Sequence, residues 1–210
     1  MSLHDNVVVQ TFLHGGPIMW PILATAVVAL AVVIERFIWQ IVEKSRRRPQ
    51  QVDEVLSKIE VGDVDGASKL ARNSKDPFLR VMWHGLHHFH SSLQGALQRA
   101  ATTEVERAER FLSILDTIVT LAPLLGLLGT VTGIMHSFSF VGNEDLAATK
   151  VSGGIAEALI ATAAGLGIAI FCLLPLNYFN RRVETFRTEL ENTATDVELL
   201  ANKSKQLATV

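Results

Sequence analysis

The chain has 210 residues, of which 49% are hydrophobic and 19% are charged, and its formal net charge is −2. This near-neutral charge argues against a nucleic-acid-binding protein, which needs a basic surface, and a single cysteine excludes a disulfide within the chain. Apolar residues are concentrated in three stretches without Asp, Glu, Lys or Arg, at 6–34, 117–143 and 158–180. Each stretch exceeds the roughly 20 residues that cross a ~30 Å hydrocarbon layer. The sequence therefore predicts a membrane protein with three spans.

The first apolar stretch is expected to form a retained transmembrane helix at 17–41, after an outward-facing segment at 1–16. No Lys or Arg precedes it, and it continues into Glu35 and Arg36 without a small-residue cleavage region. A cleaved secretory signal would have both a basic start and such a region. Glu35 and Arg36 fit either a contact with a neighbouring subunit or an ordinary interface pair, and the sequence leaves this open.

The region at 42–113 is polar and is expected to be helical. Residues 50–74 read as a short helix, a turn at Gly62 and Asp63, and a second short helix. From Leu93 to Leu115 the apolar residues recur at spacings of three and four, with no proline. This period matches one face of a helix, so one long helix is predicted to run into the second span.

Histidines cluster in "WHGLHHFH", where His84 and His88 have the i, i+4 spacing that can hold a metal ion. His87 and His90 lie beside them. No carboxylate or cysteine is nearby in the sequence, which favours an exposed surface over a metal site. We expect no metal or other cofactor.

The second span, at 114–141, contains one proline, three glycines and several threonines among its apolar residues. Asp116, Pro123, Thr130 and Ser137 recur every seven residues and so share one slowly drifting stripe of a helix. The glycines at 126, 129 and 133 thin another part of its surface and permit close helix contact in lipid. The small residues can equally serve to pack the helices of a single monomer.

The third span, at 154–179, follows a short outward loop at 142–153 and contains one carboxylate, Glu157. An ionisable side chain in a span indicates a function, because its charge is costly in lipid unless it faces water or a partner. The alternative is that Glu157 reaches the outer headgroups. Thr162 follows among small residues, and the region at 180–210 is predicted to continue this span as an amphipathic helix.

Helical rise places the two threonines at similar depths. Thr130 is about 16 Å below the expected outer end of its span, and Thr162 about 14 Å below that of the third. Thr130 and Thr162 are therefore predicted to share one polar layer. Glu157 and Thr162 differ by about 140° around an ideal helix, so both cannot point straight along one axis.

Basic residues predict the orientation of the chain. "EKSRRR" at 43–48 follows the first span and Arg181 and Arg182 follow the third, whereas the loop between spans two and three contains only Lys150. By the positive-inside rule, the N-terminus and this loop face outward, and 42–113 and 180–210 are cytoplasmic. The basic run is expected to contact anionic lipid headgroups.

Two long motifs resemble the paired signature of the MotA/TolQ/ExbB proton channel family. They are "APLLGLLGTVTGIMHSF" at 122–138 and "GGIAEALIATAAGLGIAIF" at 153–171, and "GPIMWPI" and "VVIERF" around the first span are similar to its ExbB and TolQ branches. The family's polar pore residues fall on Thr130, Thr162 and Glu157 of this chain. Asp116 is not part of that signature, so its role is open.

The resemblance implies an all-α membrane protein in the bacterial inner membrane, assembled as a homopentameric ring around a central pore. Two of its three transmembrane helices would extend through the cytoplasm. The pore would enclose single-span ExbD- or TolR-like subunits that carry a proton-binding aspartate. Glycines and alanines would let those helices pass, and threonines would offer hydroxyls to protons, the transported ion. The motor would drive a TonB-like protein for outer-membrane uptake, or a TolA-like protein for envelope integrity.

No phosphate-binding loop, metal-ligand set or nucleophile motif occurs, so an enzyme is not expected. A rival interpretation is a non-conducting membrane scaffold whose long cytoplasmic helices recruit partners. The polar residues Thr130, Thr162 and Glu157 argue against it, because a scaffold needs no polar groups at those depths. The residues do not distinguish an ExbB-like from a TolQ-like subunit.

Overall fold

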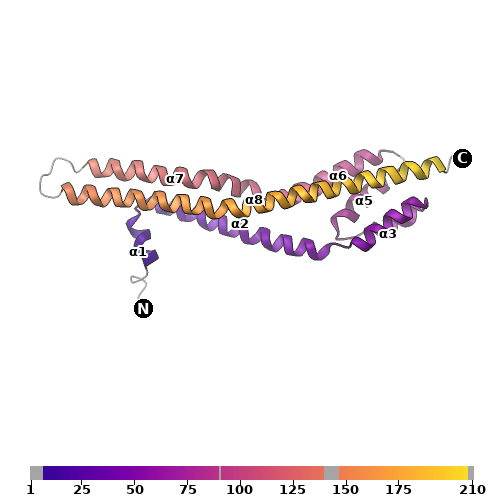
Figure 1. Ribbon diagram of the computed structural model, residues 1–210, viewed down its shortest axis with the longest axis horizontal. Helices are drawn as coiled ribbons and strands as arrows, with labels where there is room; N and C mark the ends of the chain where they lie inside the picture. The colour runs from indigo at the N-terminus through magenta and orange to yellow at the C-terminus, as the bar shows by residue number, and fades with distance from the viewer. Residues whose placement is uncertain (1–6, 90, 140–146, 208–210) are drawn as a thin grey trace. The chain divides into compact units, whose positions relative to one another are not determined.

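The structure, a computed structural model, describes residues 7–89, 91–139 and 147–207 (Figure 1). Within these ranges the chain forms eight helices and no strand. They are α1 (Val7–His14), α2 (Met19–Arg46), α3 (Pro49–Glu60), α4 (Val64–Ala71), α5 (Pro77–His87), α6 (Leu93–Glu109), α7 (Leu112–Phe138) and α8 (Ala147–Leu207). The all-α prediction is confirmed.

Three helices are long and apolar enough to cross a membrane, and they coincide with the three predicted spans: α2, α7 and the part of α8 within Val151–Lys205. Helix α8 is a single helix of 61 residues, so the predicted continuation of the third span is confirmed. The residues at which each of the three spans enters and leaves the membrane stay a prediction. Part of the expected loop at 142–153, namely 142–146, lies outside the described residues, and 147–153 form the start of α8 instead of a loop.

The polar region at 50–74 folds as predicted. Helices α3 and α4 are separated by a turn in which Gly62 has a φ of +86°, a conformation that favours glycine. Asp63 caps α4, because its side chain accepts a hydrogen bond of 2.9 Å from the backbone N–H of Gly66. The local turn and cap residues account for both helix ends.

The prediction of one long helix from Leu93 into the second span is wrong at one point. Helix α6 ends at Glu109 and α7 begins at Leu112, because Phe111 has a φ of +67°. Left-handed backbone at a non-glycine residue interrupts the helical hydrogen bonds. The apolar period continues across the break without a glycine or proline, so the sequence pattern carried no sign of it.

The chain divides into two compact units. The apolar unit consists of the residues up to Glu35 together with Phe111–Tyr178. The polar unit consists of Arg36–Arg110 together with the residues from Phe179 onward. Helices α2 and α8 each contribute to both units.

In the apolar unit, α7 and the first part of α8 lie side by side in antiparallel directions (Figure 1). Gly133 faces Gly154 and Ala158, Gly126 faces Thr162, and Gly165 faces Ala122 and Gly126. A small apolar cluster centred on Met19, Ile22 and Ala161 packs the start of α2 against α8. Small residues thus bring the backbones close where lipid offers no hydrophobic driving force between helices.

The polar unit has a separate core. Val55, Ile59, Leu79, Met82 and Leu190 are fully buried there. Beside this core, Glu104 is buried and accepts hydrogen bonds from two arginines, Arg80 and Arg107. The unit therefore resembles a soluble helical domain, with an apolar interior and a paired buried charge.

Candidate functional site

Thr130 is half-buried in α7, and its hydroxyl donates a 2.6 Å hydrogen bond to the carbonyl of Leu127, one turn earlier in the same helix. A hydroxyl carries one rotatable hydrogen and two acceptor lone pairs. Thr130 can therefore exchange this local bond for one to water or to a carboxyl group.

Thr162 is half-buried in α8, and its hydroxyl donates a 2.9 Å hydrogen bond to the carbonyl of Gly126 in α7. A β-carbon on Gly126 would lie only 3.0 Å from the Cα of Thr162, so the glycine is what allows the two backbones to approach. Thr162 thus joins the two helices, and this packing role is independent of any part in a proton path.

The contacts between α7 and α8 place Thr130 and Thr162 within about one helical turn of each other in depth. Thr162 lies opposite Gly126, four residues before Thr130 on α7, which corresponds to about 6 Å along the helix. The contacts of Gly129 with Ala161 and of Gly133 with Ala158 place Thr130 opposite residues 160–161 of α8, nearer to the level of Thr162 than to that of Glu157. That the two hydroxyls act together in one polar layer stays a prediction.

Glu157 is half-buried in α8, and its carboxyl group lies against Gly16, in the turn before α2. Gly16 has a φ of +73°, and a β-carbon there would overlap the Glu157 carboxyl. The turn therefore has room for the Glu157 carboxyl only because residue 16 is glycine. Gly16 is the first residue of the "GPIMWPI" motif, and nothing in the sequence around it indicated this contact with Glu157.

The three glycines of α7 pack within the monomer. Gly126, Gly129 and Gly133 are buried, and their nearest neighbours include α8 backbone or side-chain atoms. These glycines were expected to let the helix of a partner subunit pass close by. They pack against α8 of the same chain instead, as the alternative interpretation of packing within a monomer has it. The exposed surface of α7 instead carries leucines, including Leu124 and Leu127.

The remaining polar candidates lie elsewhere. Asp116 is exposed on α7. His84 and His87 contact the ring of Trp83, and no group of three or more potential metal ligands occurs among the residues that the structure describes. Arg36 is buried, 2% exposed, and donates a 3.1 Å hydrogen bond to the carbonyl of Ala108.

A family model for the MotA/TolQ/ExbB proton channel family matches residues 72–192, more than half of the chain. The chain belongs to this family. Members of the MotA/TolQ/ExbB family are membrane-embedded channel subunits, and the family is not one of enzymes. The three apolar helices agree with a membrane-embedded subunit.

Relatives within the family include both ExbB-named and TolQ-named proteins. An ExbB-like biopolymer transport protein of Synechocystis sp. is 36% identical over 177 residues, which cover 79% of this chain and 81% of that protein. The biopolymer transport protein ExbB of Neisseria gonorrhoeae is 36% identical over 96 residues, 45% of this chain and 44% of that protein. The Tol-Pal system protein TolQ of Haemophilus influenzae is 39% identical over 98 residues, 46% and 43% of the two chains.

Proposed function

We propose that this chain is the proton-channel subunit of an inner-membrane motor that uses the proton motive force to energise TonB-dependent outer-membrane transport. It acts as a homopentamer around single-span ExbD-like subunits, with its N-terminus periplasmic and its C-terminus cytoplasmic. A protein named ExbB-like matches over 79% of this chain, which supports this branch. A TolQ-like subunit of the Tol-Pal envelope motor is the second candidate, because a TolQ matches at comparable identity.

The observation that carries the proposal is the placement of polar groups in the apolar unit of a proton channel family member. Glu157 is a half-buried carboxylate on α8, five residues before Thr162, and Thr130 of α7 lies within about one helical turn of both in depth. In this proposal the carboxylate and the two hydroxyls exchange hydrogen bonds with water and with the partner's carboxyl group. Protons are the transported ion, and no cofactor takes part.

Threonine-to-valine variants test the proposed path, because valine keeps the shape of threonine and removes its hydroxyl. We expect Thr130→Val to abolish energy-dependent uptake in a strain that lacks its own ExbB-type subunit, while Thr130→Ser keeps much of it. Thr132→Val is the matched control, because the Thr132 hydroxyl also bonds a carbonyl of its own helix, that of Leu128 at 2.9 Å. Thr132 lies two residues away, on a different side of α7.

Thr162 and Glu157 need separate controls. Thr162→Val removes a bond to Gly126 as well as a proton-path hydroxyl, so its expression and assembly must be measured beside uptake. Thr162→Ser should retain both the bond to Gly126 and the hydroxyl of the proton path. At Glu157, we expect Asp to be tolerated better than Gln, and Ala least. Normal uptake by the Thr130→Val, Thr162→Val double variant at wild-type expression would contradict the proton path and favour a non-conducting scaffold.

Assembly and orientation have their own tests. Native mass spectrometry in mild detergent should give a homopentamer, and a monodisperse monomer would contradict the ring. In intact spheroplasts, an impermeant maleimide should label Glu144→Cys and leave Ser57→Cys unlabelled; the reverse pattern would overturn the orientation. Complementation of strains lacking an ExbB-type or a TolQ-type subunit then separates the two branches.

A further inference from the structure

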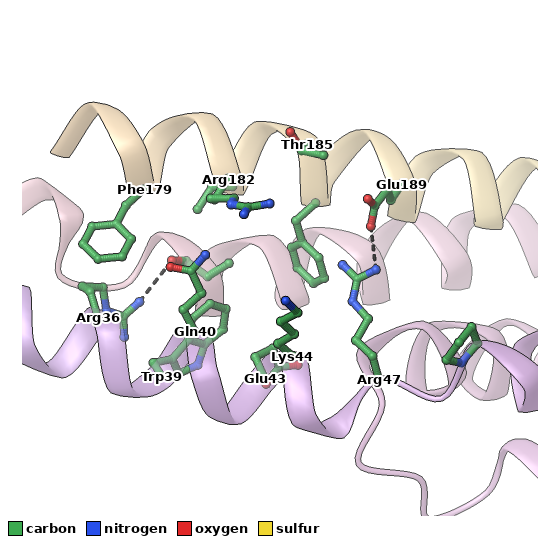
Figure 2. A pocket seen from close by; sticks show the side chains of 14 residues that line it. Arg36, Trp39, Gln40, Glu43, Lys44, Arg47, Phe179, Arg182, Thr185 and Glu189 are labelled. Carbon is green, nitrogen blue, oxygen red and sulfur yellow. Dashed lines mark hydrogen bonds and ion pairs between the residues drawn. The ribbon is translucent and has the colours of Figure 1, made fainter. Parts of the chain in front are cut away.

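A pocket of about 530 Å³ lies in the polar unit, between the end of α2 and the part of α8 that follows Phe179. Figure 2 shows Arg36, Trp39, Lys44 and Arg47 on the α2 side and Arg182 on the α8 side, facing the space between the two helices. The proposed proton path uses none of these residues. The pocket needs a separate explanation.

The lining of the pocket is positively charged. Arg36, Lys44, Arg47 and Arg182 outnumber the two carboxylates, Glu43 and Glu189. Both carboxylates already have cationic partners: Arg47 lies 2.6 Å from Glu189, and Arg46, outside the lining, lies 3.7 Å from Glu43. The lining therefore carries more positive than negative charge, which favours an anion.

Neighbouring backbone and aromatic groups hold two of these basic side chains, Arg36 and Arg47, in place. Arg36 is held by its hydrogen bond to the Ala108 carbonyl, and its guanidinium lies 5.1 Å from the centre of the Trp39 ring. Arg47 lies 4.3 Å from the ring centre of Phe78, which fixes its direction. Guanidinium groups held in this way suit the oxygen atoms of a phosphate, which accept several hydrogen bonds at once.

The pocket begins where the apolar stretches end. The charge-free parts of the chain stop at Ile34 in α2 and at Asn180 in α8, and the lining starts at Arg36 and Phe179. Phosphate groups of phospholipids lie at this border of the hydrocarbon layer, where Trp and basic side chains are enriched. Beside the pocket, Phe37 of α2 is 45% exposed and its ring centre lies 5.0 Å from that of Phe179 in the lining, so it offers apolar surface to an acyl chain.

We propose that this pocket binds the headgroup of an anionic glycerophospholipid, with the phosphate among the basic side chains and an acyl chain along the exposed ring of Phe37. A soluble phosphate ester shares the phosphate chemistry but gains nothing from Phe37. The bound lipid would link α2 to α8 at the membrane border. This inference does not depend on proton conduction.

The experiment uses the purified, delipidated full-length protein with equimolar phosphatidylglycerol and phosphatidylcholine, and counts retained lipids by native mass spectrometry. The test variant is Lys44→Gln with Arg182→Gln, which removes two charges and leaves Arg36 and Arg47 in place. At about fivefold in affinity per basic residue near an anionic lipid, phosphatidylglycerol binding should fall about 25-fold. The charge-preserving variant, Lys44→Arg with Arg182→Lys, should retain it.

The matched control is Lys69→Gln with Arg72→Gln, which removes the same charge from exposed positions of the polar unit away from the pocket. It should retain phosphatidylglycerol like the wild type. Equal retention of the two lipids by the wild type, or equal loss in the control and test variants, would overturn the proposal. Displacement of phosphatidylglycerol by millimolar inorganic phosphate would assign the pocket to a soluble phosphate instead.

Discussion

Two neighbouring glycines of α8 should respond in opposite ways to the same substitution. A β-carbon on Gly165 would overlap the carbonyl oxygen of Ala122 and lie 3.1 Å from the Cα of Gly126. These are backbone atoms, which cannot move aside without separating α7 from α8. A β-carbon on Gly167 has no atom within 4 Å in this chain. Gly165→Ala should therefore destabilise the apolar unit, and Gly167→Ala should not.

The comparison isolates the packing cost. Both substitutions gain the same helix propensity, up to about 1 kcal/mol for alanine over glycine, so this gain cancels in the difference. Overpacking of a close-packed contact costs about 1–3 kcal/mol. For a chain of this size, 1 kcal/mol shifts the unfolding midpoint by about 2–4 °C. Gly165→Ala should thus unfold about 2–12 °C below Gly167→Ala.

Cys172 provides the assay. It is the only cysteine of the chain, it is buried, and it lies two turns beyond Gly165 on α8. A dye that fluoresces on reaction with a thiol therefore reports the opening of this region during a thermal scan in detergent. Because such unfolding can be irreversible, both variants are compared at one scan rate. Equal midpoints, or a lower midpoint for Gly167→Ala, would refute the close contact of α7 with α8 at Gly165.

Two further predictions concern the polar unit. Glu104→Ala leaves two arginines without their shared carboxylate and should destabilise the unit by about 3 kcal/mol, measured by thermal unfolding; the exposed neighbour variant Glu106→Ala should stay within about 0.5 kcal/mol of wild type. The backbone N–H of Gly66, and then the side chain of Lys58, lower the pKa of Asp63 from its ordinary value of 3.8. Its capping contribution is therefore complete above pH 3.8 and is lost as the pH falls through the lowered pKa. Hydrogen exchange in α4 should accelerate in that acidic range for the wild type and show no such step for Asp63→Asn; an identical pH profile would contradict the cap.

Local signals were sufficient for much of the fold. Hydropathy depends on composition within a short window, so the three charge-free stretches identified the three spans without knowledge of any contact. The turn at Gly62 and the cap at Asp63 are likewise fixed by residues within a few positions of one another. The break at Phe111 had no such local signal, because apolar spacing continues through it and its backbone conformation depends on the surrounding structure.

Sequence and tertiary structure each determined part of the candidate site. Sequence alone determined which residue types interrupt the apolar stretches: Thr130, Glu157 and Thr162 are polar where lipid favours apolar groups. Only the tertiary structure decided their relation, since the depth of Thr162 depends on how α8 slides along α7. The hydrogen bond from Thr162 to Gly126 and the contact of Gly129 with Ala161 set that register and place the two threonines within about one helical turn of each other. A shift between two helices changes no local pattern in either, so contacts between distant residues, such as Gly16 with Glu157, could be read only from the folded chain.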